Sequence, residues 1–101
     1  MIITLDYFTI DVMELFVLWG TYCEDAIEKR IPFRDEHLTR LSKLKEEGIV
    51  ITLGPTKCTR YIFGIFNSEN VESLRNILED DVYWKEGIWT NLEIYPWVQA
   101  F

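Results

Sequence analysis

The sequence predicts an α+β fold in one small domain, on three observations. Short apolar runs rich in β-branched and aromatic residues alternate with two segments whose apolar residues recur at helical spacing. The chain has 101 residues, below the length at which a hydrophobic core usually divides into two. Apolar residues make up 49% of the chain and aromatic residues 15%, which is enough to build a core.

The first strand and the first helix are expected between residues 15 and 48. Residues 15–19 form a continuous apolar run of strand length that Gly20 closes, and a loop follows through residues 24–30. Pro32 suits the first turn of a helix, and Gly48 is placed to end it. The buried face of this helix is predicted from leucines at helical spacing: Leu38, Leu41 and Leu44.

Two more strands and a second helix follow. Residues 49–53 and 61–66 are rich in β-branched and aromatic residues, and Gly54-Pro55 begins the turn between them. We expect Asn67 or Ser68 to cap the second helix. Its apolar face is predicted to comprise Val71, Leu74, Ile77 and Leu78.

The last strand is predicted around Leu92 and Ile94, which alternate with polar residues as in a strand with one wet face. The acidic pair at residues 80–81 ends the helix before it. The complete order is β-α-β-β-α-β, the ferredoxin-like arrangement, in which both helices cover one face of an antiparallel sheet. We assign residues 13–101 to this domain and residues 1–12 to an N-terminal extension, either an arm or an extra edge strand.

The open face of such a sheet predicts self-association. The central strands in this arrangement, residues 15–19 and 61–66, are apolar on both faces, and the helices cover only one. In a monomer the other face would expose more apolar surface than the few hundred Å² typical of soluble monomers. A second copy packed sheet to sheet removes that exposure, so we expect a homodimer in the form of a dimeric α+β barrel.

Charge and cysteine content exclude several classes of partner. With 17 acidic and 10 basic side chains the formal charge is −7, which argues against nucleic acid and anionic membranes as partners. No apolar run approaches the roughly 18 residues of a membrane span, and the first residues carry no basic signal region. Cys23, Cys58 and the single histidine lack zinc-site spacing. We therefore expect a cytoplasmic protein without a metal, and a disulfide between the two cysteines is the less favoured alternative.

His37 is the candidate base, because it is the only histidine and lies beside the leucine stripe of the first helix. The N-terminal end of a helix disfavours imidazolium, so we expect a neutral ring able to accept a proton. The simpler interpretation is a partly buried histidine with one hydrogen bond and no chemistry. Asp81 is the expected partner, because the two helices run side by side. A carboxylate bonded to one ring nitrogen would set the tautomer and leave the other nitrogen as the base.

Other residues offer weaker signals. Arg34 could bind an anionic substrate group through its forked donors, or pair with a nearby acid. Asp80 is assigned a solvent-facing role. The tryptophans are interpreted as core or dimer contacts rather than as a ligand cage: Trp19, Trp84, Trp89 and Trp97. Neither GxGxxG nor GxxxxGK[ST] occurs, and no serine has the context of an activated nucleophile.

The chain resembles the YCII-related domain family in the order and spacing of a set of landmarks: Arg34-Asp35-Glu36-His37-Leu38, Gly48, Gly54-Pro55, Leu78-Glu79-Asp80-Asp81, Gly87 and Pro96-Trp97. The resemblance runs from about residue 14 to residue 101. It implies a ferredoxin-like fold assembled as a dimeric α+β barrel, with an active site on a histidine and an aspartate, which fall on His37 and Asp81. Two departures stand out: Val82 follows the aspartate where the family usually has proline, and the turn after Gly54-Pro55 is short.

Two hypotheses for function follow from the residues and the resemblance. The first is an enzyme that acts on a small molecule without a cofactor, by isomerase-, dehydratase- or dehalogenase-like acid–base chemistry. In it His37 is the acid or base, Asp81 orients His37, and Arg34 holds an anionic substrate group. The second is a non-catalytic dimer that binds a small ligand or has a regulatory role. The substrate is not identified by either hypothesis.

Overall fold

A computed structural model describes residues 13–101, so the predicted N-terminal arm lies outside the described residues. The strands are β1 (Glu14–Tyr22), β2 (Val50–Pro55), β3 (Tyr61–Ser68) and β4 (Trp89–Pro96). The helices are α2 (Ala26–Lys29), the 3₁₀ turn η1 (Ile31–Phe33), α3 (Arg34–Glu46), α4 (Val71–Glu79) and α5 (Val82–Lys85).

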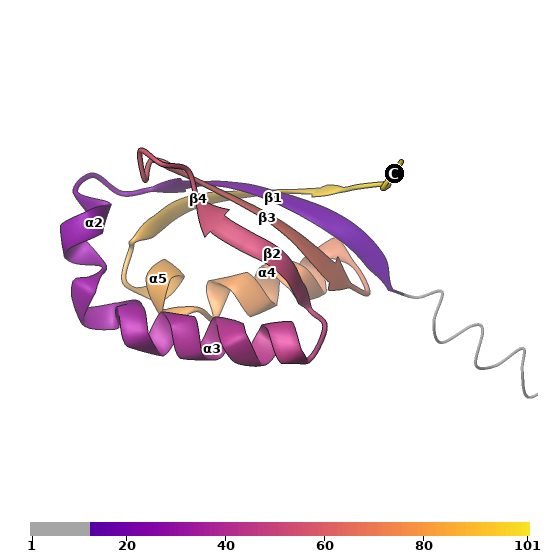
Figure 1. The fold of residues 1–101 in the computed structure, drawn as a ribbon, viewed down its shortest axis with the longest axis horizontal. Helices are drawn as coiled ribbons and strands as arrows, with labels where there is room; N and C mark the ends of the chain where they lie inside the picture. Colours follow the sequence, from indigo (N-terminus) through magenta and orange to yellow (C-terminus); the bar gives the residue numbers. More distant parts are fainter. Residues whose placement is uncertain (1–12) are drawn as a thin grey trace, which may run out of the picture.

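The four strands form one sheet in the order β2-β3-β1-β4, and every neighbouring pair is antiparallel. All the helices lie on one side of this sheet, and no element of residues 13–101 covers the other side (Figure 1). The strands β1 and β3 are central. The predicted α+β, ferredoxin-like fold is therefore confirmed. Separately, no helix within the described part of the chain is long and apolar enough to cross a membrane.

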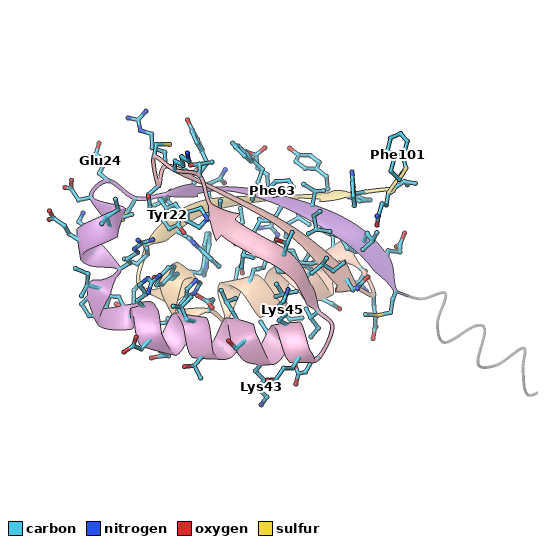
Figure 2. All side chains as sticks on the ribbon, viewed as in Figure 1. Tyr22, Glu24, Lys43, Lys45, Phe63 and Phe101 are labelled. Atoms are coloured by element: carbon cyan, nitrogen blue, oxygen red, sulfur yellow. The ribbon has the colours of Figure 1, made fainter. Side chains whose placement is uncertain are left out.

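Alternation along the central strands divides the sheet into a packed face and an open face. In β1, Phe16 and Leu18 point toward the helices and are 2% and 0% exposed, whereas Trp19 points the other way and is 38% exposed. Figure 2 shows Phe63 of β3 on the open side as well, where it is 42% exposed. The hydrophobic core thus lies between the sheet and the helices, which is the space that also holds the candidate site.

The first strand continues beyond its expected end. Gly20 was predicted to close it, but β1 runs on to Tyr22 because Gly20 pairs with residues of both neighbouring strands. A Cβ atom at Gly20 would lie 2.8 Å from the carbonyl oxygen of Asn91, so the glycine is required by the close approach of β4. The expected loop at residues 24–30 is also partly wrong, because it contains the short helix α2.

The buried face of α3 differs from the predicted leucine stripe. His37 is the buried residue of this helix, Leu41 and Leu44 are half-buried, and Leu38 is 41% exposed. Residues at positions i, i+4 and i+7 share one helix face, so placing His37 inward turns Leu38 toward the side of the helix. Pro32 lies in η1, immediately before α3, and not in the helix itself.

The expected cap of the second helix is also corrected. Asn67 and Ser68 still belong to β3, and Asn70 caps α4 by accepting a hydrogen bond from the Ser73 backbone N–H at 2.8 Å. Asp80 and Asp81 end α4 as expected, and the one-turn helix α5 follows them. This extra turn decides where Asp81 points.

Candidate active site

The candidate site lies where α3 passes α5. Asp81 is the N-cap residue of α5: its backbone is extended and its Oδ2 accepts the backbone N–H of Tyr83 at 2.9 Å. Val82 occupies the first helical position, where proline is also favoured, so the departure from the family pattern leaves this cap intact. The cap holds the Asp81 carboxylate beneath α3, with its side chain fully buried.

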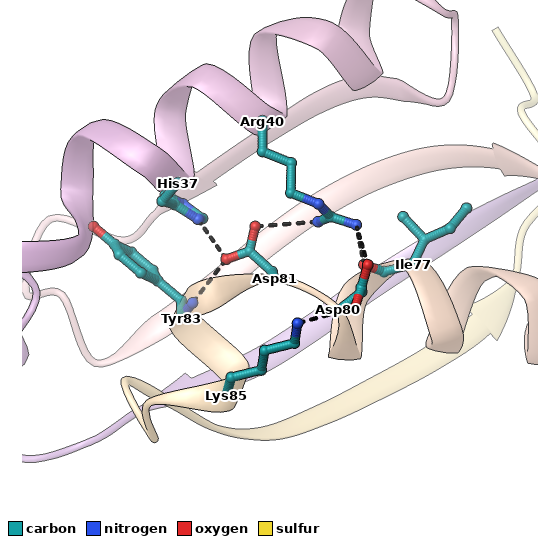
Figure 3. A network of polar contacts seen from close by, with 7 residues as sticks. All are labelled: His37, Arg40, Ile77, Asp80, Asp81, Tyr83 and Lys85. Carbon is teal, nitrogen blue, oxygen red and sulfur yellow. Dashed lines mark hydrogen bonds and ion pairs between the residues drawn. The ribbon is translucent and has the colours of Figure 1, made fainter.

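His37 and Asp81 are in direct contact. The Nδ1 atom of His37 lies 2.7 Å from Oδ2 of Asp81, and His37 is 5% exposed (Figure 3). These residues lie 44 positions apart in the sequence and come from two different helices. The structure therefore brings together the two residues that were singled out from the sequence.

Arg40 completes this arrangement, and sequence reasoning missed it. Its Nη1 donates to Oδ1 of Asp81 at 3.2 Å, and its Nη2 donates to the carbonyl oxygen of Ile77 at 2.8 Å. The signal was present, because Arg40 lies three residues after His37 and hence on the same helix face. Arg40 ties α3 to the end of α4 and neutralises the buried carboxylate.

The hydrogen bonds to Asp81 define the state of the His37 ring. The Asp81 carboxylate accepts hydrogen bonds from His37, from Arg40 and from the Tyr83 backbone. An ionised Asp81 can only accept, so Nδ1 of a neutral His37 carries the proton. The lone pair is then on Nε2, and this nitrogen is the one available to take a proton.

The Nε2 atom of His37 remains accessible. Within residues 13–101 it has no hydrogen-bond partner, and the only side-chain nitrogen or oxygen there that is both sealed from solvent and unpaired is Nε1 of Trp89. His37 also lines a cavity of about 160 Å³. The free nitrogen of the ring therefore faces a space that a small molecule can enter.

Aromatic contacts fix the plane of the imidazole. Tyr83 stacks on His37 with ring centroids 3.6 Å apart and an angle of 7° between the planes. Trp89 contacts His37 edge-on, with ring centroids 5.2 Å apart and an angle of 86° between the planes. Two ring contacts and one short hydrogen bond leave the imidazole little rotational freedom, so Nε2 keeps one direction.

The cavity is lined by apolar side chains of α3 and β2 and by two positively charged arginines. Arg34 lines it, together with Arg30, and Arg34 forms no ion pair within residues 13–101. Its remaining lining residues are Tyr22, His37, Leu38, Leu41, Leu53, Gly54, Pro55, Ile62, Tyr83 and Trp89. No acidic side chain belongs to this lining, although the chain as a whole is strongly acidic. The site therefore suits a small ligand with negative or electron-rich oxygens.

The neighbouring acid, Asp80, behaves differently from Asp81. Its side chain is 69% exposed and accepts an ion pair from Lys85 at 3.1 Å. The hydrogen bond and the charge of Lys85 lower the pKa of Asp80. The solvent-facing role expected for Asp80 is confirmed, and adjacent aspartates thus occupy opposite environments.

Two features lie apart from the site. A larger hollow of about 730 Å³, between the end of β1 and the β2–β3 turn, contains neither His37 nor Asp81 and shares Tyr22 with the cavity beside His37. Cys23 and Cys58, which line that hollow, are both free thiols. Within residues 13–101, no three histidine, cysteine or acidic side chains converge as a metal-binding group.

Comparison with known proteins places this geometry in context. The sequence profile of the family described as the YCII-related domain matches residues 14–98. Protein YciI of Escherichia coli O6:H1 (strain CFT073) is 27% identical over 97 residues, which cover 86% of this chain and 99% of the relative. An uncharacterized protein of Haemophilus influenzae is 24% identical over 96 residues, covering 85% and 98%.

The fold is also similar to that of solved structures, among them 5-chloro-2-hydroxyhydroquinone dehydrochlorinase (TftG) from Burkholderia phenoliruptrix AC1100, in complex with 2,5-dihydroxybenzoquinone. The TM-score is 0.74 and the sequence identity 22%, with coverage of 85% of this chain and 95% of that one. At this identity the likeness establishes the arrangement of strands and helices.

Proposed function

This chain belongs to the YCII-related domain family, and on that premise we propose that it is an enzyme that moves protons on a small molecule. His37 is the general base and acid, Asp81 orients it and stabilises its charged form, and Arg34 attracts an anionic group of the substrate. Side chains carry out these proton transfers, so the proposal requires no metal or organic cofactor.

The observation that carries the proposal is the buried His37–Asp81 contact beside a cavity. A histidine with only a structural role needs hydrogen bonds to its ring and gains nothing from a free nitrogen that faces a cavity. Here Nδ1 is bonded at 2.7 Å while Nε2 has no partner within residues 13–101. That combination provides a fixed tautomer and an accessible base, the two requirements of general base catalysis.

The reaction class follows from the size and charge of the cavity. A volume of about 160 Å³ is comparable to an engineered cavity of roughly 150 Å³ that binds benzene, so one ring fits. TftG, which shares the fold, is named as a dehydrochlorinase and was solved with an oxygenated six-membered ring. We therefore assign this chain to proton abstraction beside a carbonyl or enol on a small oxygenated ring, followed by isomerisation or elimination.

The test is turnover of a panel of cyclic hydroxy acids, oxo acids and halogenated hydroxyquinols by wild type and the His37→Gln variant. We expect at least one substrate, and a fall in kcat of about 10²-fold or more with His37→Gln, because general base catalysis contributes about that much. Asp80→Asn is the matched control and should retain turnover. Unchanged turnover of an identified substrate by His37→Gln would refute the proposal. Binding without turnover would favour the alternative, a ligand-binding or regulatory domain.

We also propose that the open face of the sheet, defined by Val17, Trp19, Tyr61, Phe63 and Ile65, packs against a second copy of this chain. The face is apolar, and Trp19 and Tyr61 stack on it with ring centroids 5.2 Å apart. Two chains of charge −7 repel each other, and these central-strand positions carry no charge. A symmetric, sheet-to-sheet homodimer removes the apolar surface from water with little repulsion.

Sedimentation of Phe63→Glu tests the homodimer. We expect wild type to sediment as a dimer at micromolar concentration and Phe63→Glu as a folded monomer, because the charge would be buried in the interface. Ile31→Glu is the control, since Ile31 is 68% exposed on the opposite side of the molecule in η1. A wild-type monomer, or a Phe63→Glu dimer as tight as wild type, would contradict the proposal.

A further inference from the structure

The cavity beside His37 contains a second side chain that can donate a proton, Tyr22, at the end of β1. We propose that the Tyr22 hydroxyl binds the substrate oxygen that gains negative charge when His37 removes a proton. Tyr22 is then a catalytic residue in addition to the histidine and the aspartate. The inference rests on the proposed function, because it names the group on the electron-accepting side of the same reaction.

The position of Tyr22 fits this role. Its side chain lies on the helix side of the sheet, in the layer that holds the core (Figure 2), and it is 8% exposed. It approaches the cavity from the sheet, whereas His37 approaches from α3. Within residues 13–101 the hydroxyl has no hydrogen bond of normal geometry and is not a sealed atom, so it keeps access to the cavity. A ring bound there would lie between a base and a donor.

The surroundings of Tyr22 favour a neutral hydroxyl that donates well. Burial raises the pKa of Tyr22 above its ordinary value of 10.0, so the proton stays on at neutral pH. The indole N–H of Trp89 and the positive charges of Arg30 and Arg34 lower the pKa of Tyr22, because they stabilise negative charge on the phenol oxygen. These groups make the hydroxyl more polar without ionising it.

Trp89 lies beside this hydroxyl. Its Nε1 is sealed from solvent and makes no hydrogen bond of normal geometry within residues 13–101, although the Tyr22 oxygen lies near it, and a buried donor without a well-placed acceptor usually costs free energy. Trp89 pairs with Tyr22 across the sheet, where β4 adjoins β1. As the Tyr22 hydroxyl donates to a substrate oxygen, its own oxygen becomes a better acceptor for this indole N–H. The Trp89 N–H then gains a hydrogen bond to the Tyr22 oxygen as negative charge develops on the substrate. This bond stabilises the charged transition state more than the ground state, as catalysis requires.

The proposed step conserves atoms and electrons. A C–H bond beside a carbonyl breaks, and its proton forms an N–H bond at Nε2 of His37. The electron pair of that bond moves through the carbon framework onto the carbonyl oxygen, giving an enolate that accepts a hydrogen bond from Tyr22. The imidazolium then returns the proton to another carbon, which completes an isomerisation. In an elimination, the enolate electron pair instead forms a carbon–carbon double bond, a halide on the adjacent carbon leaves with the electron pair of its carbon–halogen bond, and the imidazolium releases its proton to water. No oxidant or reductant takes part.

The experiment measures binding of 2,5-dihydroxybenzoquinone by calorimetry to wild type, Tyr22→Phe and Tyr95→Phe. We expect wild type to bind, and Tyr22→Phe to bind about tenfold more weakly, because the variant lacks one hydrogen bond to an electron-rich oxygen. Tyr95→Phe is the matched control. It removes a hydroxyl that bonds to Glu93 at 2.8 Å on the exposed end of β4, so binding should be unchanged. Thermal unfolding confirms that each variant is folded.

The outcomes separate this inference from the proposed function. Equal binding by wild type and Tyr22→Phe overturns the role of Tyr22, as does failure of wild type to bind the probe at millimolar concentration. For an identified substrate, the Tyr22→Phe variant should lose about 10²-fold in kcat with a smaller change in KM, because the donor acts mainly on the charged transition state. If His37→Gln loses turnover while Tyr22→Phe keeps it, the inference fails and the proposed function stands. If His37→Gln keeps turnover, the proposed function itself fails.

Discussion

Replacing Asp81 by Asn isolates the charge of the buried carboxylate while keeping its shape. Asparagine is as good a helix N-cap as aspartate, so its oxygen can still accept the Tyr83 backbone N–H. Both this bond and the His37 bond use the same carboxylate atom, Oδ2. The amide oxygen will therefore take that position, and the amide NH₂ will then face Nη1 of Arg40, a donor 3.2 Å from the atom replaced.

The cost can be worked out from these contacts. Arg40 loses a charged hydrogen bond, which is worth about 1.5–3 kcal/mol, and the lower half applies because its side chain is 28% exposed. His37 keeps a weaker bond to a neutral oxygen, which adds roughly 0.5–1 kcal/mol. The expected loss is about 2–3 kcal/mol of unfolding free energy, or a fall in Tm of roughly 8–24 °C for a domain of this size.

Two measurements check this prediction. Urea denaturation gives the free energy of unfolding, with Asp80→Asn as the matched control, since that neighbour is exposed and its loss should leave stability close to wild type. Long-range ¹H–¹⁵N NMR gives the tautomer without ambiguity, because His37 is the only histidine in the chain. At pH 8 wild type should show a protonated Nδ1 and a bare Nε2, and Asp81→Asn a mixture of tautomers.

Either of two results would show that the buried charge of Asp81 does not have this effect. If Asp81→Asn were as stable as wild type, or if Asp80→Asn were equally destabilised, the buried network would not be the source of the difference. If wild type showed the opposite tautomer, with the proton on Nε2, the hydrogen bond at 2.7 Å would have the wrong polarity for a base facing the cavity.

Two further predictions concern stability. Gly20→Ala should lower the free energy of unfolding by about 1–3 kcal/mol, because the added Cβ would lie 2.8 Å from the Asn91 carbonyl oxygen. Gly54→Ala is the control and should leave the free energy of unfolding unchanged, since a Cβ there meets nothing within 4 Å. Equal urea midpoints for the two variants would contradict a role for the close approach at Gly20. Burial raises the pKa of Tyr22 and of Tyr83 above 10.0, so the folded chain holds these protons more tightly than the unfolded chain does. Their stabilising effect is fully present below pH 10 and is lost as pH rises through the folded-state pKa values. Tm should therefore fall as pH rises above 10, less steeply in Tyr83→Phe, and a flat profile would be incompatible with this origin.

Much of the fold could be predicted because each strand carries its own apolar pattern. The runs at residues 15–19 and 61–66 are unmistakable, and the order of elements then leaves few topologies. The predicted ends of the strands and helices were less accurate, because these ends depend on contacts with other elements that the local sequence does not show. Gly20 looked like a strand end, but its lack of a side chain serves the contact with β4, which only the sheet reveals.

The candidate site was predicted in part. The lone histidine and an aspartate at a helix end were visible as residues, and the expectation that the two helices lie side by side suggested their contact. Arg40 was missed because an arginine on an exposed-looking helix is usually solvated, and only packing shows that it reaches the carboxylate. Tyr22 was missed for a related reason: nothing in a strand sequence says which ring will line a cavity.

The double role of Asp81 explains why stability and chemistry are coupled in this protein. The same carboxylate caps α5, orients His37 and receives Arg40, so three contacts from α3 and α5 determine its geometry. A change of charge at Asp81 therefore lowers the stability of the fold. The same contacts keep the His37 imidazole aligned before any ligand binds. Alignment that exists before binding need not be created during the reaction, which is the advantage of a preorganised site. A variant of Arg40 such as Arg40→Met should therefore weaken both properties together, lowering Tm and mixing the His37 tautomers, although Arg40 does not line the cavity.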